Sequence, residues 1–478
     1  MQKPLIYWFR QDLRLHDNPT LSAAVESGKP IIAVYILNED TSNKWTEGSA
    51  SRWWLHHSLQ ELSHTLSQLG SRLILHKGKV TDVLSQLIEE TDADALYFSR
   101  QYEPYASQLE DRINKLFSDQ VEIKRFKGYL LYEPESIRTG SNQPYKVFTP
   151  FYKSCLSHSQ PLQPIPAPEK INAYKNKVKS ELLSQWDLLP TKPNWAMQFS
   201  DYWIPGENGA HQVLNEFILH ACSKYSVLRN RPDVTGTSRL SPHLHFGEIS
   251  PRQVWVGIKN SQHNIIDSGE PYLRQLIWRE FSYHLLTHWP DFPDKPFRSE
   301  FSQFSWKKDN KALHLWQKGQ TGYPIVDAGM RELWKTGWMH NRVRMIVASF
   351  LIKDLLIPWQ QGEEWFWDTL VDANLANNSA GWQWVAGCGA DAAPYFRVFN
   401  PVLQGEKFDP QGDYVRTWIP ELKKLPKKYI HSPWQCPADV LASAQIKLGE
   451  DYPHPIVEHS EARDRALNAY HELKAITA

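Results

Sequence analysis

The feature that most constrains the fold is a change of hydrophobic pattern along the chain. Up to residue 131, short apolar runs alternate with stretches whose apolar residues recur at helical spacing. This alternation is typical of a parallel sheet with crossover helices. From residue 207 onward, helical spacing continues without strand-like alternation. The chain is therefore predicted to combine an α/β N-terminal domain, built on a doubly wound parallel sheet, with an all-α C-terminal domain.

The N-terminal domain contains short apolar runs that are predicted to be strands. They cover residues 5–9, 31–37, 72–76, 95–99 and 121–125, with predicted helices over 51–69 and 80–90. Asn18 precedes Pro19, so it is a predicted helix N-cap. No GxGxxG motif follows the first strand. This absence argues against a nicotinamide dinucleotide site, because those glycines let the backbone approach a pyrophosphate.

A proline-rich connector is predicted between the two domains. Seven prolines fall between Pro161 and Pro205, and proline disfavours both helix interiors and central strands. The predicted division is an α/β domain over 1–131, an interdomain linker over 132–206 and a helical domain over 207–478. The predicted helices of the last part are 210–224, 251–259, 271–287, 325–336, 341–356 and 363–372, followed by an amphipathic stretch over 460–474.

Charge and cysteine usage narrow the classes of function. The net charge is +0, so any DNA site must be a local patch. The four cysteines are far apart and form no CxxC motif, which suits a reducing, cytoplasmic location. His243 and His245 lack carboxylates at metal-ligand spacing, so no metal site is expected. No apolar run approaches the about 18 residues that a membrane span needs.

Tryptophan is the unusual residue in the composition. The chain contains 21 tryptophans, against about six expected from ordinary usage. A Trp-rich core, stacking on flat ligands or bases, and electron transfer through the rings all remain open as explanations.

Five segments of the helical part contain residues suited to chemistry. In 235–244, hydroxyls and an arginine before a predicted helix suit a phosphate, although an N-cap and turn is the plainer reading. In 272–281, one helical face carries an amide, a broad ring and a guanidinium, which suits a stacked base or a buried ion pair. Asn341, Arg344 and Met345 share a helical stripe in 337–345, where a methionine more often marks core.

The two remaining segments differ in how strongly they indicate a site. In 372–384, several amides stand beside small residues. Buried amides need partners, so a site that reads the polar edge of a flat heterocycle is the favoured interpretation. In 393–401, Arg397 suits a phosphate, and a solvated loop is the alternative.

These segments, in this order, resemble motifs of the cryptochrome/photolyase family. The resemblance includes residues 7–14, 237–242, 278–281, 337–345, 372–384 and 391–401, and it extends over nearly the whole chain. It implies an α/β antenna domain joined by a long loop to a helical domain that binds FAD. The family's cofactor contacts fall on Tyr225, Thr237, Ser238, Arg239, Leu240, Ser241, Arg279, Arg344, Asp372, Asn374 and Asn378.

The resemblance also implies a role for each group of these residues. Tyr225 and residues 237–241 would hold the phosphates and ribose, and Asn378 would face the flavin N5. Arg344 and Asp372 would pair beside the flavin ring. The family's electron-relay tryptophans match Trp382, Trp359 and Trp306.

By the same resemblance, the substrate is a flipped pyrimidine dimer in UV-damaged DNA. Its predicted contacts are the aromatic walls Trp278 and Trp384, the lesion contacts Gln275, Asn341 and Met345, and the phosphate contacts Arg229, Arg342 and Arg397. Two residues depart from the usual pattern. Gln275 stands where many such enzymes have glutamate, and Asn374 stands where aspartate is usual.

The expected activity is light-driven repair of cyclobutane pyrimidine dimers by electron transfer from photoexcited reduced FAD. This would be a carbon–carbon lyase that acts as a monomer, is cytoplasmic, and is nucleoid-associated when bound to DNA. Residues 100–105 and 278–284 resemble the bacterial subgroup near plant cryptochromes, which is associated with a methenyltetrahydrofolate antenna. A blue-light photoreceptor of the cryptochrome type is the main alternative. A flavoprotein oxidoreductase with a diffusible substrate is a third.

Overall fold

The computed structural model describes residues 2–40, 42, 44–158, 161–261, 265–392 and 397–477. Spatial contacts divide the chain into two compact units. The first unit comprises residues 1–194, 200–223 and 238–290, and the second comprises 195–199, 224–237 and 291–478. The predicted domains are continuous ranges with limits at residues 131 and 206, whereas both units are made of several separate ranges. The predicted limits therefore stay a prediction.

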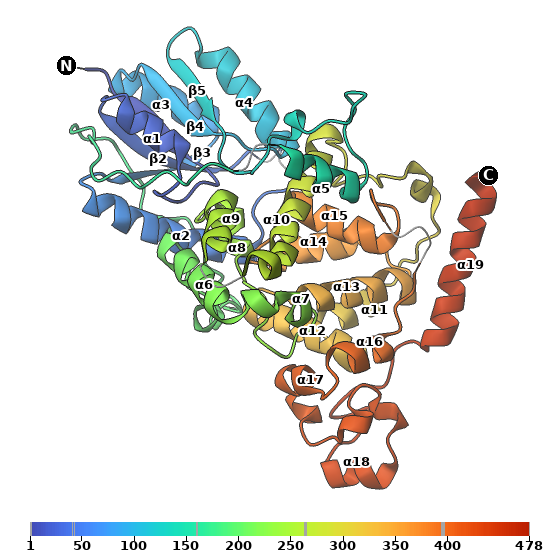
Figure 1. Cartoon of the computed structure of the whole chain (residues 1–478). Helices are drawn as coiled ribbons and strands as arrows, with labels where there is room; N and C mark the ends of the chain where they lie inside the picture. The colour runs from blue at the N-terminus through green and yellow to red at the C-terminus, as the bar shows by residue number, and fades with distance from the viewer. Residues whose placement is uncertain are drawn as a thin grey trace. The chain divides into compact units, whose positions relative to one another are not determined.

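The first unit contains a parallel sheet of five strands in the order β3-β2-β1-β4-β5 (Figure 1). The strands are β1 (Leu5–Phe9), β2 (Ile31–Asn38), β3 (Leu73–Gly78), β4 (Ala95–Ser99) and β5 (Glu122–Phe126). Central strand β1 pairs in parallel with both β2 and β4, so Tyr7 lies opposite Ala33 and Tyr97. All five predicted strands are present, with ends within two residues of the prediction. The doubly wound parallel sheet is confirmed.

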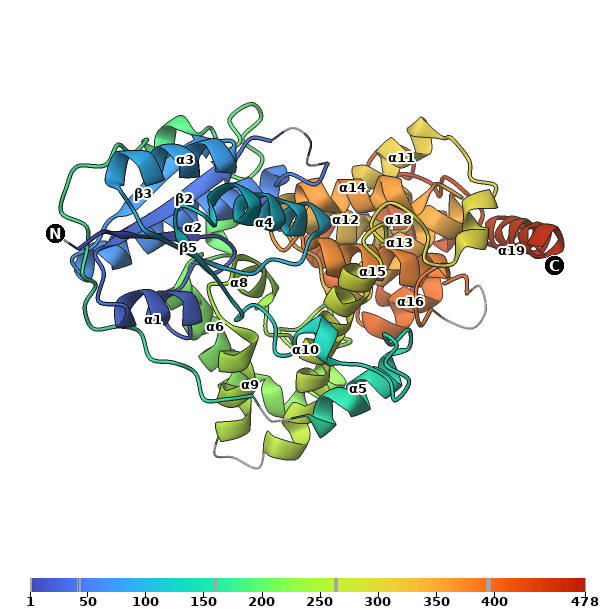
Figure 2. The same ribbon diagram turned by 90° about the horizontal axis from the view of Figure 1, so that it is seen from above.

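Helices connect the strands and cover both faces of the sheet. They are α1 (Pro19–Glu26), α2 (Ser49–Gln68), α3 (Val80–Thr91) and α4 (Pro104–Phe117). Because side chains alternate between the faces of a strand, Ile6 and Trp8 join Leu84 of α3 and Ile113 of α4 in one buried cluster. Helix α1 lies on the other side of the sheet from α3 (Figure 2). As predicted, Asn18 caps α1 by accepting the Leu21 N–H at 3.0 Å, whereas α4 was not predicted.

Five further helices belong to the first unit. They are α5 (Phe148–Ser157), α6 (Glu207–His220), α8 (Ser241–Phe246), α9 (Pro251–Asn260) and α10 (Ile265–His288). The predicted start of the last helix at Pro271 was wrong, because α10 continues through this proline. Helix α5 lies in the predicted connector, and the same connector reaches the sheet where Ala173 bridges to Ile31.

The second unit is helical. Its helices are α7 (Tyr225–Leu228), α11 (Asn310–Gln317), α12 (Pro324–Thr336), α13 (Asn341–Ser349), α14 (Trp359–Thr369), α15 (Leu375–Ala386), α16 (Pro401–Phe408), α17 (Asp413–Trp418), α18 (Ala438–Ala444) and α19 (His459–Thr477). The prediction of one α-helix over 341–356 was wrong in its extent. Helix α13 ends at Ser349, and a π-helical turn, Phe350–Asp354, follows it. Sequence reasoning missed α15, because its amides and small residues indicated a binding segment.

The described residues also form short 3-10 helices. They are Pro134–Ser136, Leu183–Gln185, Phe199–Asp201, Cys222–Lys224, Ser299–Gln303, Pro420–Leu422, Lys427–Tyr429 and Pro433–Gln435. Among the described helices, none is both long and apolar enough to cross a membrane.

Candidate functional site

Helix α10 carries Gln275, Trp278 and Arg279 on one face. Trp278 is half-buried, and Phe148 of α5 stacks on it with ring centroids 3.6 Å apart and planes 6° apart. Gln275 Nε2 donates to the backbone oxygen of Pro271 at 3.1 Å, which orients the amide. Since Phe148 covers one face of the indole, only the opposite face can stack on a ligand.

Arg279 is buried inside the first unit. Its guanidinium lies 4.4 Å from the ring centroid of Tyr129, and its Nη1 donates to the Tyr129 backbone oxygen at 3.0 Å. Its Nη2 is buried and has no hydrogen-bond partner among the described residues. Buried donors are nearly always satisfied in folded proteins, so this atom marks a place where a ligand acceptor would fit.

Glu280 follows Arg279 and pairs with it at 3.3 Å. Its Oε2 accepts the backbone N–H groups of Leu131 and Tyr132 at 2.8 and 3.1 Å. Burial raises the pKa of Glu280 to about 7. These bonds fasten α10 to the segment that follows β5, so much of this predicted motif serves packing.

The loop before α8 has an unusual backbone. Arg239 has a φ of 54°, in the left-handed region, and Leu240 follows with φ −78° and ψ −5°. Consecutive left- and right-handed residues turn successive N–H groups toward one point, which forms an anion-binding nest. Ser238 Oγ hydrogen-bonds Tyr272 Oη at 2.8 Å and accepts the Leu240 N–H at 3.3 Å. The hydroxyl thus fixes the loop and occupies the Leu240 N–H, which would have to exchange partners to bind a phosphate.

The remaining predicted phosphate and ribose contacts occupy element ends. Tyr225 is buried at the start of α7, Thr237 is half-buried in its loop, and Ser241 is the exposed first residue of α8. Arg229 follows α7, with its guanidinium 5.5 Å from the ring centroid of Tyr225.

Arg342 on α13 is a half-buried cation held by neutral groups. Its Nη2 donates to Asn230 Oδ1 at 2.6 Å, its Nη1 lies 3.6 Å from Met345 Sδ, and its guanidinium lies 4.5 Å from the Phe408 ring centroid. Burial lowers the pKa of Arg342, and the positive charge of Arg229 lowers it further. No ion pair to Arg342 is present in the described part of the chain, so an anion would be stabilised here.

Arg344 and Asp372 form the ion pair that the family resemblance implies. Arg344 Nη2 donates to both carboxylate oxygens at 3.1 and 2.8 Å, and its Nε donates to the Met339 backbone oxygen at 2.7 Å. The carboxylate side chain is 4% exposed, and the arginine side chain is 23% exposed. The pair therefore presents its positive end to the surroundings.

Amides organise the start of α15. Asn374 is its N-cap, and its side chain accepts the Asn377 N–H at 3.1 Å. Asn378 Nδ2 donates to the backbone oxygen of Glu363 at 3.0 Å. Because this bond uses the amide nitrogen, the oxygen of Asn378 is the atom oriented to accept from a ligand.

The resemblance assigns three tryptophans to an electron relay, and two of them are buried while the third is partly buried. Trp382 and Trp359 are 2% and 1% exposed, and partly buried Trp306 packs against the same cluster. Trp382 lies against the first turn of α14, which begins at Trp359, because a Cβ on Gly362 would come within 2.1 Å of the Trp382 ring. Trp382 Nε1 is buried without a partner among the described residues.

The other predicted DNA contacts are more exposed. Trp384 is half-buried against the core of the second unit, Asn341 is exposed at the start of α13, and Arg397 is exposed. Residues 393–396 of the fifth predicted segment lie outside the described residues.

Nothing in the sequence indicated two residues that orient the predicted site residues. Phe148 backs Trp278, and Glu363 accepts from Asn378 and from Ser379. Neither had a local signal: Phe148 lies in the predicted connector, and Glu363 looked like an ordinary charged helix residue.

Comparison with known proteins identifies the family. Residues 5–169 match the family described as DNA photolyase, and residues 272–472 match the FAD binding domain of DNA photolyase. A deoxyribodipyrimidine photo-lyase of Agrobacterium fabrum is 51% identical, with 99% of each chain covered. Cryptochrome-1 of Arabidopsis thaliana is 37% identical, over 99% of this chain and 71% of that protein. A solved class III photolyase from Agrobacterium tumefaciens has a TM-score of 0.96 at 50% identity, covering 99% of this chain and 98% of that one. The chain therefore belongs to the DNA photolyase and cryptochrome family.

Proposed function

We propose that this chain is a deoxyribodipyrimidine photo-lyase, a carbon–carbon lyase that uses blue light to split cyclobutane pyrimidine dimers in DNA. The main support for this proposal is the similarity to a deoxyribodipyrimidine photo-lyase, which is 51% identical over 99% of both chains. The chain also retains tryptophans at both positions that the resemblance assigns to dimer binding, Trp278 and Trp384.

FAD, when bound and reduced, supplies the photoexcited electron donor, and the protein binds and orients it. The residues present fit this cofactor. The turn at Arg239 and Leu240 would supply backbone donors for the phosphates. The resemblance adds Tyr225, Thr237, Ser238 and Ser241 as contacts of the phosphates and ribose. The unpartnered Arg279 Nη2 adds a buried donor for the same group.

The flavin ring has a separate set of residues. Arg344 presents its positive end beside Asp372, which suits a ring carrying negative charge. Asn378 presents its amide oxygen, and an acceptor facing N5 favours a ring that carries a proton there. Asn374 lies beside this set as the α15 cap, so it acts on the ring by orienting the helix start.

Trp382, Trp359 and Trp306 would carry an electron inward from the surface. Trp306 is partly buried, whereas Trp359 and Trp382 are buried, so Trp306 would be the outer end of such a chain. Trp382 Nε1 has no acceptor among the described residues, so proton loss from an oxidised Trp382 would be disfavoured. The positive charge would then pass outward along the rings.

The DNA set consists of two stacking rings, three lesion contacts and three cations. Trp278 offers the indole face opposite Phe148, and stacking on one base contributes about 1–3 kcal/mol. A damaged, poorly stacked dimer costs less to flip than an intact pair. Gln275, Asn341 and Met345 would contact the lesion, and Arg229, Arg342 and Arg397 would hold phosphates. Binding would then weaken as salt concentration rises.

The same proposal extends to the antenna and the setting of the enzyme. A second chromophore, methenyltetrahydrofolate by resemblance, would pass light energy to FAD. Acid release of the chromophore from purified protein, followed by mass analysis, identifies it. The enzyme would act as a monomer in the cytoplasm, associated with the nucleoid when it binds DNA.

The deciding experiment is repair of a thymine-dimer oligonucleotide by the purified, reduced protein under blue light and in the dark. Recovery of thymine absorbance only under light is the expected result, and it would show that Gln275 is tolerated. If bound FAD is photoreduced and no dimer is split, the photo-lyase assignment is wrong. The chain would then be a photoreceptor of the cryptochrome type.

A further inference from the structure

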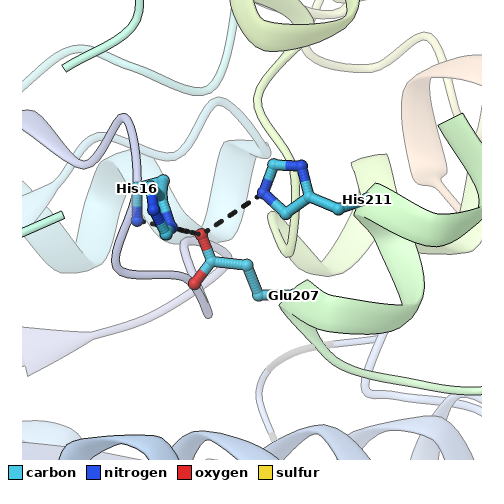
Figure 3. A group of neighbouring side chains, drawn as sticks. All are labelled: His16, Glu207 and His211. Carbon is cyan, nitrogen blue, oxygen red and sulfur yellow. Dashed lines mark hydrogen bonds and ion pairs between the residues drawn. The ribbon is translucent and has the colours of Figure 1, made fainter. Parts of the chain in front are cut away.

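A cluster of two histidines and one glutamate lies in the first unit and includes none of the residues assigned above. His16 belongs to the segment after β1, and Glu207 and His211 stand one turn apart on α6. Figure 3 shows both imidazole rings turned toward the same oxygen of Glu207. His16 Nδ1 lies 2.9 Å from Glu207 Oε1, and His211 Nε2 lies 3.8 Å from it.

The spacing of these atoms suits a metal ion. The three ligand atoms all lie within 4.8 Å of one another, and no other such group occurs among the described residues. Tetrahedral zinc with bonds near 2.0–2.1 Å holds its ligand atoms about 3.4 Å apart. The two separations from Oε1 bracket this value, and all three atoms lie within 4.8 Å, so movements of the two accessible imidazoles would bring the ligand atoms to metal-binding distances.

The carboxylate is held rigidly, and the imidazoles are accessible. Glu207 is 7% exposed, with Oε2 accepting the Leu15 N–H at 2.7 Å and Oε1 accepting the His16 N–H at 2.9 Å. The side chains of His16 and His211 are 53% and 37% exposed. One ligand is thus fixed before binding, and two can move onto an ion that enters from solvent.

We propose that His16, Glu207 and His211 form a binding site for a divalent transition metal, with zinc as the ion that best suits two imidazoles and one carboxylate. Solvent supplies the fourth ligand. The metal replaces the proton shared by His16 Nδ1 and Glu207 Oε1. It also replaces the 3.4 Å contact between His211 Nε2 and Gln253 Nε2.

Metal binding would tie the segment after β1 to α6. Without a metal, this tie includes the hydrogen bonds from residues 15 and 16 to Glu207 and the edge-on contact between the His16 and His211 rings. An ion that binds only the folded arrangement stabilises it by mass action, so the melting temperature would rise with zinc concentration.

The test is calorimetric titration of zinc into the full-length protein after chelator treatment. His211→Ala and His16→Ala are the test variants, since both side chains are accessible and their loss leaves Glu207 in place. His220→Ala is the matched control, because His220 also pairs with a glutamate on α6, Glu216, at 3.3 Å but without a second histidine.

The expected result is one zinc per chain, with affinity reduced by at least about tenfold in both test variants and unchanged in the control. The melting temperature should rise with zinc in the wild-type chain and in His220→Ala only. Zinc binding that is absent from the wild-type chain, or equal in all four proteins, would overturn the site.

Discussion

Helices α10 and α15 each carry one tryptophan assigned to dimer binding, and they fix their side chains by different interactions. On α10, Trp278 is held by a stacked ring, and Arg279 and Glu280 are held by a buried ion pair. On α15, Asn378 and Gln383 are held by hydrogen bonds to backbone groups of other segments. A stacked ring keeps its opposite aromatic face available to a ligand. An amide that is already hydrogen-bonded on one side keeps its remaining polar atom available.

The difference shows why similar residue types acquire different tasks. Arg279 and Arg344 both stand beside acidic partners. Arg279 is buried, and its Nη1 fastens α10 to the segment after β5 while its Nη2 has no partner among the described residues. Arg344 remains 23% exposed beside a buried carboxylate. Residue type predicts which chemistry a position can perform. The surroundings decide whether that capacity is used within the fold or offered to a ligand.

The largest expected effect comes from removing the buried indole of α15. Trp382→Phe should reduce photoreduction of FAD, in the presence of a thiol, to the background level, because a phenyl ring is much harder to oxidise than an indole. Repair by chemically reduced enzyme should continue. Flavin absorbance during illumination measures the first effect.

Trp316→Phe is the matched control for this variant. Trp316 is equally buried and its ring centroid lies 6.2 Å from that of Trp382, yet the resemblance gives it no relay role. It should retain photoreduction. Equal loss in both variants would show that packing, and not electron transfer, explains the effect.

The amide anchoring of α15 can be broken at Gln383. Its Nε2 donates to the backbone oxygens of Phe292 and Lys295 at 2.6 and 3.0 Å, and its Oε1 accepts the Phe297 N–H at 2.8 Å. Gln383→Met should lower the free energy of unfolding by about 3 kcal/mol, because three backbone groups lose their partner. Denaturant titration measures this change. Asn377→Ala, which removes only a half-buried amide bonded to Asn374, should cost less than about 1 kcal/mol.

The ring contact on α10 can be broken at Trp278. Trp278→Ala should weaken binding of dimer-containing DNA by about 10- to 100-fold, the loss expected for one stacked base, while FAD stays bound. Fluorescence anisotropy of a labelled oligonucleotide measures the affinity. Trp334→Ala is the control, since Trp334 is 43% exposed and also stacks on a ring, that of Trp365. An unchanged affinity for Trp278→Ala would exclude the aromatic contact.

The buried pair on α10 predicts a dependence on pH. Burial raises the pKa of Glu280 from 4.5 to about 7, so the folded state holds this proton more tightly than the unfolded state. The resulting stability is complete below about pH 4.5 and is lost as pH rises through about 7. Relative to wild type, Glu280→Gln should gain about 2–3 kcal/mol in free energy of unfolding between pH 5 and pH 8. Parallel stability curves would contradict the raised pKa.

The smallest effect is expected at the cap of α15. Asn374→Asp keeps an oxygen that can accept the Asn377 N–H, so the free energy of unfolding should change by no more than about 0.5 kcal/mol. A shift in the absorbance spectrum of bound flavin would show that residue 374 influences the electronic state of the flavin ring. A large loss of stability would mean that the Asn374 amide has a further structural bond that aspartate cannot make.

The sequence predicted secondary-structure elements better than it predicted which side chains contact one another. All five strands and the Asn18 cap were correct, because alternation and capping are properties of neighbouring residues. The start of α10, the π-helical turn after α13 and the whole of α15 were missed. Pro271 is accommodated inside a helix, and the amides of α15 are satisfied by Glu363 and other distant groups that no local pattern reveals.

By itself, the sequence determined the α/β and helical parts of this protein, its family resemblance and the residue types of its candidate site. The tertiary structure decided what each of those residues faces. It placed Phe148 on Trp278, oriented Asn378 through Glu363, and brought His16 to Glu207 and His211. The physical reason is that periodicity and motif spacing are local, whereas a side chain's partner depends on packing between segments far apart in the chain.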